Sequence, residues 1–541
     1  MIINKVVTTG SPLSVPSHLS FAQYAIDKLR ENSENNDAVA VINGDTNQQI
    51  TFKQILQETV NTATGLLRLG VKRGDVVALC SENRDEFMPT ALAVVCCGAT
   101  ITTYNLLYSK DEMTHVLNIS RPRLLFASEL ALQRHLATFK SQSSIEKIIQ
   151  LNGKVVASGI LEYRSVGVPT NPFEYEPVEV EGWKDIAYIL YSSGTTGLPK
   201  GVMLTHLNVL YSAASFAIDN PLENVVLLTI VPWYHAYGLM STMNYILIKR
   251  KLVYLNGFNP VKYLSSIQEY KITNLAAVPP IVVFLAKAPI VEKFDLSSIN
   301  TIWCGAAPLS AETIAGALKR MKNCKGIFQA YGMTETSLTA TKDIDDDKIA
   351  RKPGSAGYPL NGVKAKVVDI DTRKRLGPNE NGEICLKGPL IMKGYYGNPE
   401  ATLDVFDEEG YLKTGDVGYY DKDGCFFIVD RLKELIKYKG HQVAPAAVES
   451  VVLEHPGVAE CGVVGAPDEA VGELATAFVV KKPGATVTEK ELLEFTASRL
   501  SSVSRLHGGI IFIEDIPKNP SGKILRRALK QKLLDRQKSK L

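Results

Sequence analysis

The sequence predicts an α/β protein, with a large N-terminal domain of mostly parallel sheets that ends in a β-rich subdomain, followed by a small α+β C-terminal domain. First, short apolar runs of strand length alternate with longer amphipathic stretches, as in sheets whose two faces are covered by helices. Second, the pattern changes at about residue 363 to short strands divided by turn residues. Third, 541 residues exceed what one hydrophobic core usually holds.

Apolar runs bounded by polar or turn residues locate the strands, and the helices lie between them. Strands are predicted over 76–79, 186–191, 225–231, 252–254 and 302–303, and helices over 52–69 and 311–321. Farther along, turns rich in glycine, asparagine and aspartate at 377–382 and 421–424 predict antiparallel pairing. We therefore expect an N-terminal domain of residues 1–430, which includes the β-rich subdomain at about 363–430, and a C-terminal domain of residues 431–541.

The charge balance and the cysteines disfavour several classes of protein. Lys and Arg number 60 against 57 Asp and Glu, and the formal charge of +3 is too small to predict a nucleic-acid partner. The eight cysteines contain no C-x-x-C pair, which disfavours a zinc site or a disulfide framework and fits reduced thiols inside a cell. The charge-free stretches 89–109 and 224–248 contain polar residues such as Asn105 and Asn244, so we interpret both as buried core and expect no membrane span.

The tripeptide Ser539-Lys540-Leu541 is an address that the peroxisomal import receptor reads at a C-terminus. We therefore expect that receptor as a partner and the peroxisome as the location. The basic run before the tripeptide is also typical of the solvated face of a terminal helix, with Leu525, Leu529 and Leu533 facing inward at i, i+4 and i+8.

A loop rich in hydroxyls and glycine follows the strand predicted at 186–191. It offers backbone amides, four hydroxyl groups and one ammonium, which together suit the oxygens of a polyphosphate. These residues are Ser192, Ser193, Gly194, Thr195, Thr196 and Lys200. The loop is not the P-loop of nucleotide triphosphatases, because its glycine spacing differs and Gly201 follows the lysine. From composition alone, an ordinary polar turn is an equally good interpretation.

The string at 191–202 resembles the phosphate loop of the adenylate-forming (ANL) superfamily, which includes acyl-CoA synthetases, 4-coumarate:CoA ligases, beetle luciferases and nonribosomal adenylation domains. Similar blocks follow in order: aromatic and histidine (233–238), adenine (305–309), nucleotide and metal (329–335), ribose (411–416), hinge (430–445) and lysine (517–523). The ordered series covers nearly the whole chain. The resemblance implies an enzyme that activates a carboxylic acid with ATP and passes the acyl group to coenzyme A.

Adenylation brings a carboxylate against the α-phosphate of ATP, and these two anions repel until cations and donors neutralise them. The resemblance implies that Glu335 holds Mg²⁺ with the phosphates and that Thr334 bonds the α-phosphate. It also implies that Lys523 bridges the carboxylate and phosphate oxygens. From composition alone, Lys523 would be interpreted as a solvated lysine of a basic tail.

The ribose and the adenine have their own candidates. An ionised carboxylate only accepts hydrogen bonds, so Asp416 suits both ribose hydroxyls, and Arg431 can donate to the same ribose. The resemblance assigns Ala307 to the adenine side and places Gln329, Ala330 and Tyr331 in the nucleotide and metal block, where Tyr331 is a candidate for stacking on adenine. The alternatives are a surface ion pair for Asp416 and Arg431 and a core position for Tyr331.

The acyl side has two candidates. His235 lies in a charge-free run, where a lone histidine is more often a core residue. The resemblance implies instead that His235 and Tyr237 lie on the substrate side and help to orient the carboxylate.

Thioester formation needs a second arrangement of the site, because the thiol attacks from a different face. Members of the family solve this by rotating a mobile C-terminal domain about a hinge, whose position Lys433 matches. The residues then brought to the adenylate and coenzyme A are Lys437, Lys439, Gly440 and Gln442.

The segment 430–440 and the Ser-Lys-Leu end are most similar to the branch of luciferases and 4-coumarate:CoA ligases. We expect a medium- or long-chain fatty acid, because the peroxisomal address fits acyl activation and the predicted pocket wall is mostly apolar. An aryl acid is the alternative. A light-emitting oxygenase is disfavoured, because Tyr234 precedes His235 where luciferases have a second histidine, and 211–220 contains no arginine. A silent binding protein is disfavoured because every expected polar position is filled.

Overall fold

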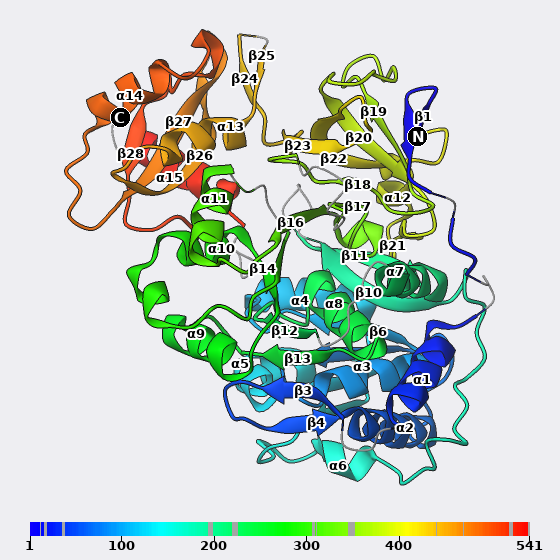
Figure 1. The fold of residues 1–541 in the computed structure, drawn as a ribbon. Helices are drawn as coiled ribbons and strands as arrows, with labels where there is room; N and C mark the ends of the chain where they lie inside the picture. Colours follow the sequence, from blue (N-terminus) through cyan, green and yellow to red (C-terminus); the bar gives the residue numbers. More distant parts are fainter. Residues whose placement is uncertain are drawn as a thin grey trace.

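The computed structural model describes residues 1–10, 12–15, 19–34, 38–192, 198–218, 225–305, 309, 311–344, 352–439, 441–468, 470–518 and 523–538. This part of the chain forms four β-sheets with helices packed on them, which confirms the predicted α/β class (Figure 1). Two sheets form the body of the large domain, a third lies at one end of the body, and the fourth belongs to the C-terminal domain.

The first body sheet has eight strands and is parallel through its centre. Its order is β21 (Gly394–Tyr395), β11 (Lys200–Thr205), β10 (Ile186–Ser192), β6 (Thr100–Tyr104), β5 (Val76–Cys80), β7 (Leu124–Ala127), β8 (Lys147–Gln150) and β9 (Leu161–Glu162). β10 runs parallel to β6, whereas β11 and β21 continue the sheet in antiparallel pairs. The central strand β5 is buried along its whole length, which explains its unbroken apolar sequence.

The second body sheet has nine strands, also parallel in the middle. Its order is β18 (Tyr358–Pro359), β17 (Thr341–Lys342), β16 (Gly326–Tyr331), β15 (Thr301–Cys304), β14 (Asn274–Ala277), β12 (Val226–Thr229), β13 (Lys251–Tyr254), β3 (Val39–Asn43) and β4 (Gln49–Thr51). The parallel strands β15 and β16 lead at their carboxyl ends into the predicted adenine and metal blocks. Ligand sites of α/β sheets typically lie at such ends.

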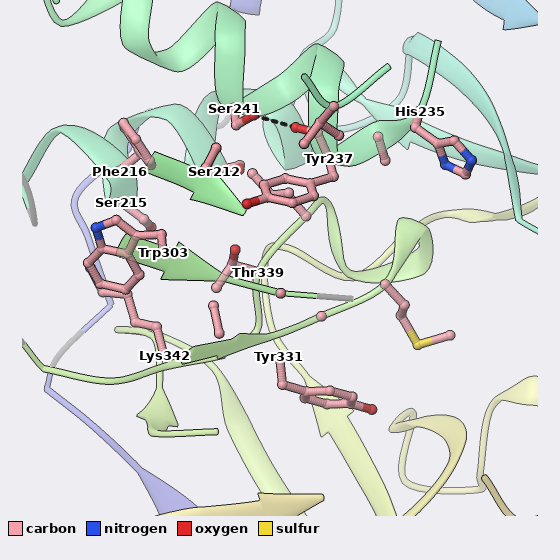
Figure 2. A pocket seen from close by; sticks show the side chains of 18 of the residues that line it. Ser212, Ser215, Phe216, His235, Tyr237, Ser241, Trp303, Tyr331, Thr339 and Lys342 are labelled. Atoms are coloured by element: carbon pink, nitrogen blue, oxygen red, sulfur yellow. Dashed lines mark hydrogen bonds between the residues drawn. The ribbon is translucent and has the colours of Figure 1, made fainter. Parts of the chain in front are cut away.

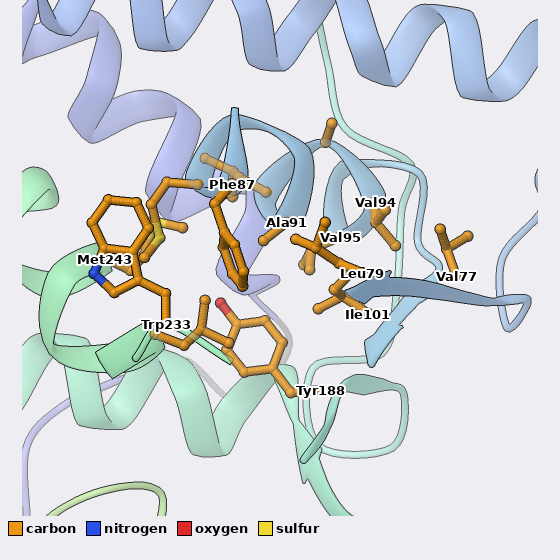
Figure 3. Close-up of a cluster of buried hydrophobic side chains, with 14 of the residues drawn as sticks. Val77, Leu79, Phe87, Ala91, Val94, Val95, Ile101, Tyr188, Trp233 and Met243 are labelled. Carbon is orange, nitrogen blue, oxygen red and sulfur yellow. The ribbon is translucent and has the colours of Figure 1, made fainter. Parts of the chain in front are cut away.

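Helices fill the space between these sheets and cover their outer faces (Figure 1). They are α1 (Phe21–Asn32), α2 (Phe52–Arg68), α3 (Phe87–Cys96), α4 (Lys110–Ser120), α5 (Glu129–Lys140), α6 (Tyr163–Val166), α7 (His206–Ile218), α8 (Ala236–Leu247), α9 (Pro260–Glu269), α10 (Pro279–Lys287) and α11 (Ala311–Arg320). Figure 3 shows part of the main core, in which Phe87 of α3 packs edge-on against Trp233 with ring centroids 5.9 Å apart, close to Tyr188 of β10. The core therefore joins both sheets through α3.

The third sheet is antiparallel and contains two strands from the N-terminus. Its order is β1 (Ile2–Ile3), β2 (Val6–Thr8), β19 (Lys364–Val368), β20 (Gly382–Lys387), β22 (Leu412–Tyr420) and β23 (Phe426–Arg431). The turn residues between strands predicted the antiparallel pairing, but nothing in the sequence predicted that β2 pairs with β19. The short helix α12 (Pro399–Val405) lies beside β21 and β22.

The fourth sheet is formed by β25 (His441–Val443), β24 (Ile436–Tyr438), β27 (Gly472–Lys481) and β26 (Val458–Asp468), with β28 (Ile510–Phe512) paired to β27. The helices of this domain are α13 (Pro445–Leu453), α14 (Glu489–Ala497) and α15 (Arg526–Lys538). The predicted division at residues 430 and 431 falls at the end of β23, and its exact position stays a prediction.

Most predicted elements occur within one or two residues of their expected ends, and the stretches 89–109 and 224–248 are mainly buried strand and helix. No helix among the described residues is long and apolar enough to cross a membrane. The inward position predicted for Leu525 is wrong: it precedes α15 and is 43% exposed, whereas Leu529 and Leu533 are buried. Since α15 begins only at Arg526, Leu525 is not on the face that those two residues share.

Candidate active site

Glu335 is a buried carboxylate close to the end of β10. It lies in the 3₁₀ turn η2 (Thr334–Thr336), which comes shortly after β16, and it is 3% exposed. Its Oε1 accepts hydrogen bonds from Ser192 Oγ at 2.8 Å and from the Tyr395 hydroxyl at 3.0 Å. Its Oε2 is buried and has no hydrogen-bond partner among the described residues. Such an oxygen is costly to bury unless a cation or a donor satisfies it.

Both described ends of the predicted phosphate loop lie near this carboxylate. Ser192 bonds it directly, and Lys200 Nζ lies 4.8 Å from the centroid of the Tyr395 ring. Burial and the charge of Glu335 raise the pKa of Tyr395, so its hydroxyl stays protonated and donates. The loop residues Ser193, Gly194, Thr195 and Thr196 lie outside the described residues.

Asp416 is a second buried carboxylate, paired across β22 and β23. It lies opposite Arg431 in the antiparallel register, and Arg431 Nε is 3.1 Å from Asp416 Oδ1. The Tyr331 hydroxyl donates to Asp416 Oδ2 at 2.7 Å. Burial and the nearby Asp416 raise the pKa of Tyr331 well above its usual range. The three residues predicted to surround the nucleoside are therefore in contact, with Asp416 at their centre.

Gln329 supports the adenine block through the backbone. Its Oε1 accepts from Leu309 N at 3.3 Å, and its Nε2 donates to Ser355 O at 3.0 Å. Because the side chain is buried and bonded at both ends, it positions the chain at Leu309, the last residue of the adenine block. Ala330 lines the adjoining cavity, and Ala307 lies outside the described residues.

A cavity of about 240 Å³ extends from this region into the large domain. Its wall includes Ser212, Ser215, Phe216, Leu227, Val231, His235, Tyr237, Ser241, Trp303, Ala330, Tyr331, Met333, Thr334 and Lys342. Figure 2 shows His235 at one side of the cavity, Tyr237 in the middle, and Trp303 with Lys342 at the opposite side. Burial lowers the pKa of His235, so its ring is neutral near pH 7. The predicted substrate residues His235 and Tyr237 thus share one cavity with Thr334.

The charges of Arg431 and Asp416, which are predicted to bind the nucleoside, act on Lys523, although Lys523 comes from the C-terminal domain. Burial lowers its pKa, Arg431 lowers it further, and the carboxylates of Glu434 and Asp416 raise it in part. A half-buried lysine influenced by Arg431 and Asp416 is not a lysine of a solvated tail. The orientation of the two domains therefore brings Lys523 toward the nucleoside side of the site.

The other predicted C-terminal residues lie elsewhere. Lys437, Lys439 and Gln442 are exposed on the hairpin of β24 and β25, which Figure 1 shows at the top of the molecule, away from β16. Lys433 is exposed in the turn between β23 and β24. Gly440 lies outside the described residues. In this orientation the hairpin and Lys523 occupy different places.

A buried ion network connects the turn after β23 to the helix that follows Lys523. Arg526 of α15 donates to Glu434 Oε2 at 3.0 Å and to both oxygens of Glu449 at 2.8 Å. Burial raises the pKa of Glu449 to about 7, against the lowering effect of Arg526. Since Arg526 lies three residues after Lys523, this network fixes the position of the segment that carries Lys523.

The sequence did not predict Tyr395, Ser215, Trp303 or Lys342 as part of the site. Tyr395 reaches Glu335 because β21 pairs with β11, and that pairing has no local signal. Lys342 comes from β17, whose position opposite Ala330 in β16 places both side chains on one face. A lysine that follows Thr341, shortly after the metal block, was the signal available for it.

The fold and this arrangement define a two-domain, nucleotide-binding enzyme whose site contains residues from both domains. A model of the AMP-binding enzyme family matches residues 29–396, and a model of the AMP-binding enzyme C-terminal domain matches residues 447–523. The chain is 40% identical over 506 residues to a luciferin 4-monooxygenase of Nipponoluciola cruciata, with 91% of each protein covered. It is 37% identical over 531 residues to the 4-coumarate–CoA ligase CCL1 of Humulus lupulus, covering 97% of this chain and 95% of that protein.

Among solved structures, ATP-bound MatB from Rhodopseudomonas palustris is similar with a TM-score of 0.85 and 27% identity, covering 95% of this chain and 99% of that one. The chain belongs to the AMP-binding enzyme family, within the adenylate-forming (ANL) superfamily. This confirms the superfamily and the branch that the sequence blocks predicted. An ATP site follows from membership of the family.

Proposed function

We propose that this protein is an AMP-forming carboxylic acid:CoA ligase, and that its site works in two half-reactions. In the first, the acid's carboxylate oxygen attacks the α-phosphorus of ATP, the bond to the β-phosphate oxygen breaks, and pyrophosphate leaves. In the second, the thiol of coenzyme A loses its proton and attacks the acyl carbonyl, and AMP leaves. The observation that carries the proposal is the Oε2 of Glu335, which is buried beside Ser192 at the start of the phosphate loop and has no hydrogen-bond partner in the part of the chain that the structure describes.

Glu335 fits a role as a Mg²⁺ ligand. Hard divalent cations prefer carboxylate oxygens and keep phosphate or water as their remaining ligands. The described residues contain no cluster of three or more His, Cys, Asp or Glu side chains that could hold a metal alone. A cation at Glu335 would therefore complete its ligand set with phosphate oxygens, and when bound it would neutralise their charge.

The other residues divide the remaining tasks. Asp416 accepts the ribose hydroxyls, and Arg431 and Tyr331 hold its carboxylate in place. Lys523 stabilises the negative charge that develops between the acid and the α-phosphate, while Thr334 donates to that phosphate. His235 is neutral, so it orients the carboxylate through a hydrogen bond without adding charge.

Coenzyme A is the proposed acyl acceptor, and the hairpin of β24 and β25 is its proposed contact. Rotation about the turn at Lys433 would remove Lys523 and bring Lys437, Lys439, Gly440 and Gln442 to the adenylate. The exposure of Lys437, Lys439 and Gln442 supports this proposal, because a contact used in only one orientation must be free in the other.

For the acid, we propose a medium- or long-chain fatty acid, supported by the aliphatic part of the cavity wall at Leu227, Val231 and Met333. A second candidate is an aryl acid, favoured by Phe216, Tyr237 and other rings in the same wall. Oxygenation of luciferin is the activity named for several relatives. The sequence around His235 still argues against that activity in this protein, despite the overall similarity.

The peroxisome remains the proposed location and its import receptor the proposed partner. Ser539-Lys540-Leu541 lies outside the described residues, and support comes from its sequence alone. Fusion of residues 531–541 to a fluorescent protein, with and without the final leucine, would test both proposals by import.

The activity itself is tested with purified protein, ATP, Mg²⁺ and a panel of fatty and aryl acids, with and without coenzyme A. We expect AMP and pyrophosphate in equal amounts, and an acyl-CoA thioester when coenzyme A is present. Photon counting with luciferin and oxygen runs in parallel. A protein that forms no AMP with any acid contradicts the proposal, and light without thioester formation would favour the oxygenase.

A further inference from the structure

The strand that carries Asp416 is irregular at that residue. β22 lies between β20 and β23 in the third sheet (Figure 1). Glu383 of β20 pairs with Val417 of β22. The next pair is Cys385 with Lys413, so residues 414–416 of β22 lie opposite the single residue 384 of β20. Such a bulge takes backbone groups out of the ladder and changes the direction of its side chains. The direction of the Asp416 carboxylate therefore depends on what holds the bulge.

Side chains bond the backbone amides that the bulge takes out of the ladder. Asp416 N donates to Thr414 Oγ1 at 3.1 Å, and Thr414 Oγ1 donates to Ile384 O at 2.8 Å. Gly415 N donates to Glu383 Oε1 at 3.1 Å. Gly415 has a φ of +71°, in the left-handed region that favours glycine, so the chain changes direction at this residue. Glu383 thus holds the residue directly before Asp416.

Glu383 is suited to this contact because it is both buried and neutralised. It is 4% exposed, and its Oε2 lies 2.5 Å from Arg373 Nη1. A buried carboxylate is tolerated when it is paired and hydrogen-bonded in this way. The ion pair uses Oε2, and Oε1 accepts from Gly415 N. A hydrogen bond from a backbone amide to a charged carboxylate is stronger than one to a neutral acceptor, so Glu383 holds the bulge firmly.

We propose that Glu383 is a positioning residue for nucleotide binding: by holding the amide of Gly415, it directs the Asp416 carboxylate toward the ribose hydroxyls. The proposal rests on the ribose contact proposed for Asp416 and deepens it. Glu383 acts through the backbone of residues 414–416 rather than on the nucleotide itself. Arg431 holds the Asp416 side chain from β23, and Glu383 holds the backbone that presents it from β20.

The test compares ATP with 2′-deoxy-ATP by kcat/KM for acid-dependent pyrophosphate release. The two nucleotides differ only in the ribose 2′-hydroxyl, so the ratio of their kcat/KM values measures the hydrogen bond that Asp416 accepts from it. The wild-type protein should prefer ATP by about ten- to a hundred-fold, as expected for a hydrogen bond to a charged group. Because both nucleotides use the same enzyme molecules, the ratio does not change with the fraction of a variant that is folded.

Two variants of Glu383 remove its contact with Gly415 in different ways. Glu383→Gln should lower the ratio by about five-fold or more, because its amide offers Gly415 N either a neutral acceptor or a donor. Glu383→Asp keeps the charge for Arg373 but is one methylene shorter, so its oxygen no longer reaches Gly415 N and the ratio should fall as well. Glu380→Gln is the matched control, since Glu380 also accepts from a glycine amide, that of Gly377, but is exposed in the turn before β20. This control should keep the wild-type ratio.

The outcomes separate the positioning role from the proposed function. If Asp416→Asn lowers the ratio but both Glu383 variants stay within about two-fold of wild type, the positioning role is overturned and the ribose contact stands. Equal use of the two nucleotides by the wild-type protein overturns the ribose contact, and the positioning role with it. Absence of acid-dependent pyrophosphate release in the wild type defeats the proposed function as a whole.

Discussion

Replacing Asp416 with Asn should lower kcat/KM for ATP without abolishing the binding of ATP. Asp416 is 4% exposed, pairs with Arg431 at 3.1 Å and accepts from Tyr331 at 2.7 Å. An amide has the same shape but no charge, and one of its two ends is a donor. The contact with Tyr331 would change from a charge-assisted to a neutral hydrogen bond, Arg431 would lose its counter-charge, and one ribose hydroxyl would face a donor.

A charge-assisted hydrogen bond exceeds a neutral one by about 1 kcal/mol, so weakening two ribose bonds and leaving Arg431 less well neutralised costs about 2 to 3 kcal/mol. This corresponds to a loss of roughly 30- to 150-fold in kcat/KM for ATP. Tyr331→Phe removes one donor to Asp416 and keeps the carboxylate, so its loss should stay at about ten-fold or less.

The assay is pyrophosphate release at varied ATP and saturating acid, with Asp371→Asn as the control. Asp371 is exposed in a turn of the third sheet, and its replacement should leave kcat/KM for ATP unchanged. If Asp416→Asn retained the wild-type kcat/KM for ATP in a folded protein, Asp416 would not bind the ribose, and the nucleoside side of the site would be assigned wrongly.

Three other predictions follow from the same geometry. Lys523→Ala should reduce acid-dependent pyrophosphate release by about a hundred-fold or more, while thioester formation from supplied acyl-AMP continues. Lys437→Ala should show the reverse pattern. Equal effects of each variant on both steps would argue against domain rotation. Glu335→Gln should raise the Mg²⁺ concentration needed for half-maximal rate, measured at fixed ATP, and an unchanged requirement would remove Glu335 from the metal site. Burial lowers the pKa of His206 to about 4. The folded state therefore binds fewer protons than the unfolded state between about pH 4 and 6.5. The free energy of unfolding should fall by about 3 kcal/mol as pH decreases through that window. Urea unfolding of the wild type and of His206→Gln at several pH values measures this, and an equal pH slope in both would contradict it.

The alternation of strands and helices was predictable because it is a local pattern. β5 and β10 are buried on both sides, so their sequences are continuous apolar runs, and α2 has one apolar face. The pairing of β2 with β19 was not predictable, since a strand of three residues carries no signal for a partner more than 350 positions away. Leu525 was misplaced because helical spacing was extended one residue before the helix begins.

For the site, the sequence blocks predicted the residues whose chemical type is distinctive. Asp416, Arg431 and Tyr331 do meet, and Glu335 does lie beside the phosphate loop. Tyr395 and Ser215 were missed, because each is an ordinary core residue by sequence and gains its meaning only from the neighbours that tertiary packing provides. The acid itself was predicted from an apolar wall, whereas the cavity wall in the structure also contains Lys342 and several hydroxyl groups, which the sequence blocks did not indicate.

The most direct measurement of the central claim is acid-dependent exchange of labelled pyrophosphate into ATP in the absence of coenzyme A. If the residues around Glu335 and Asp416 bring a carboxylate and ATP together to form an acyl-adenylate, the label enters ATP only when a suitable acid and Mg²⁺ are present. Exchange that needs coenzyme A, or no exchange with any acid that yields a thioester, would contradict an adenylate intermediate.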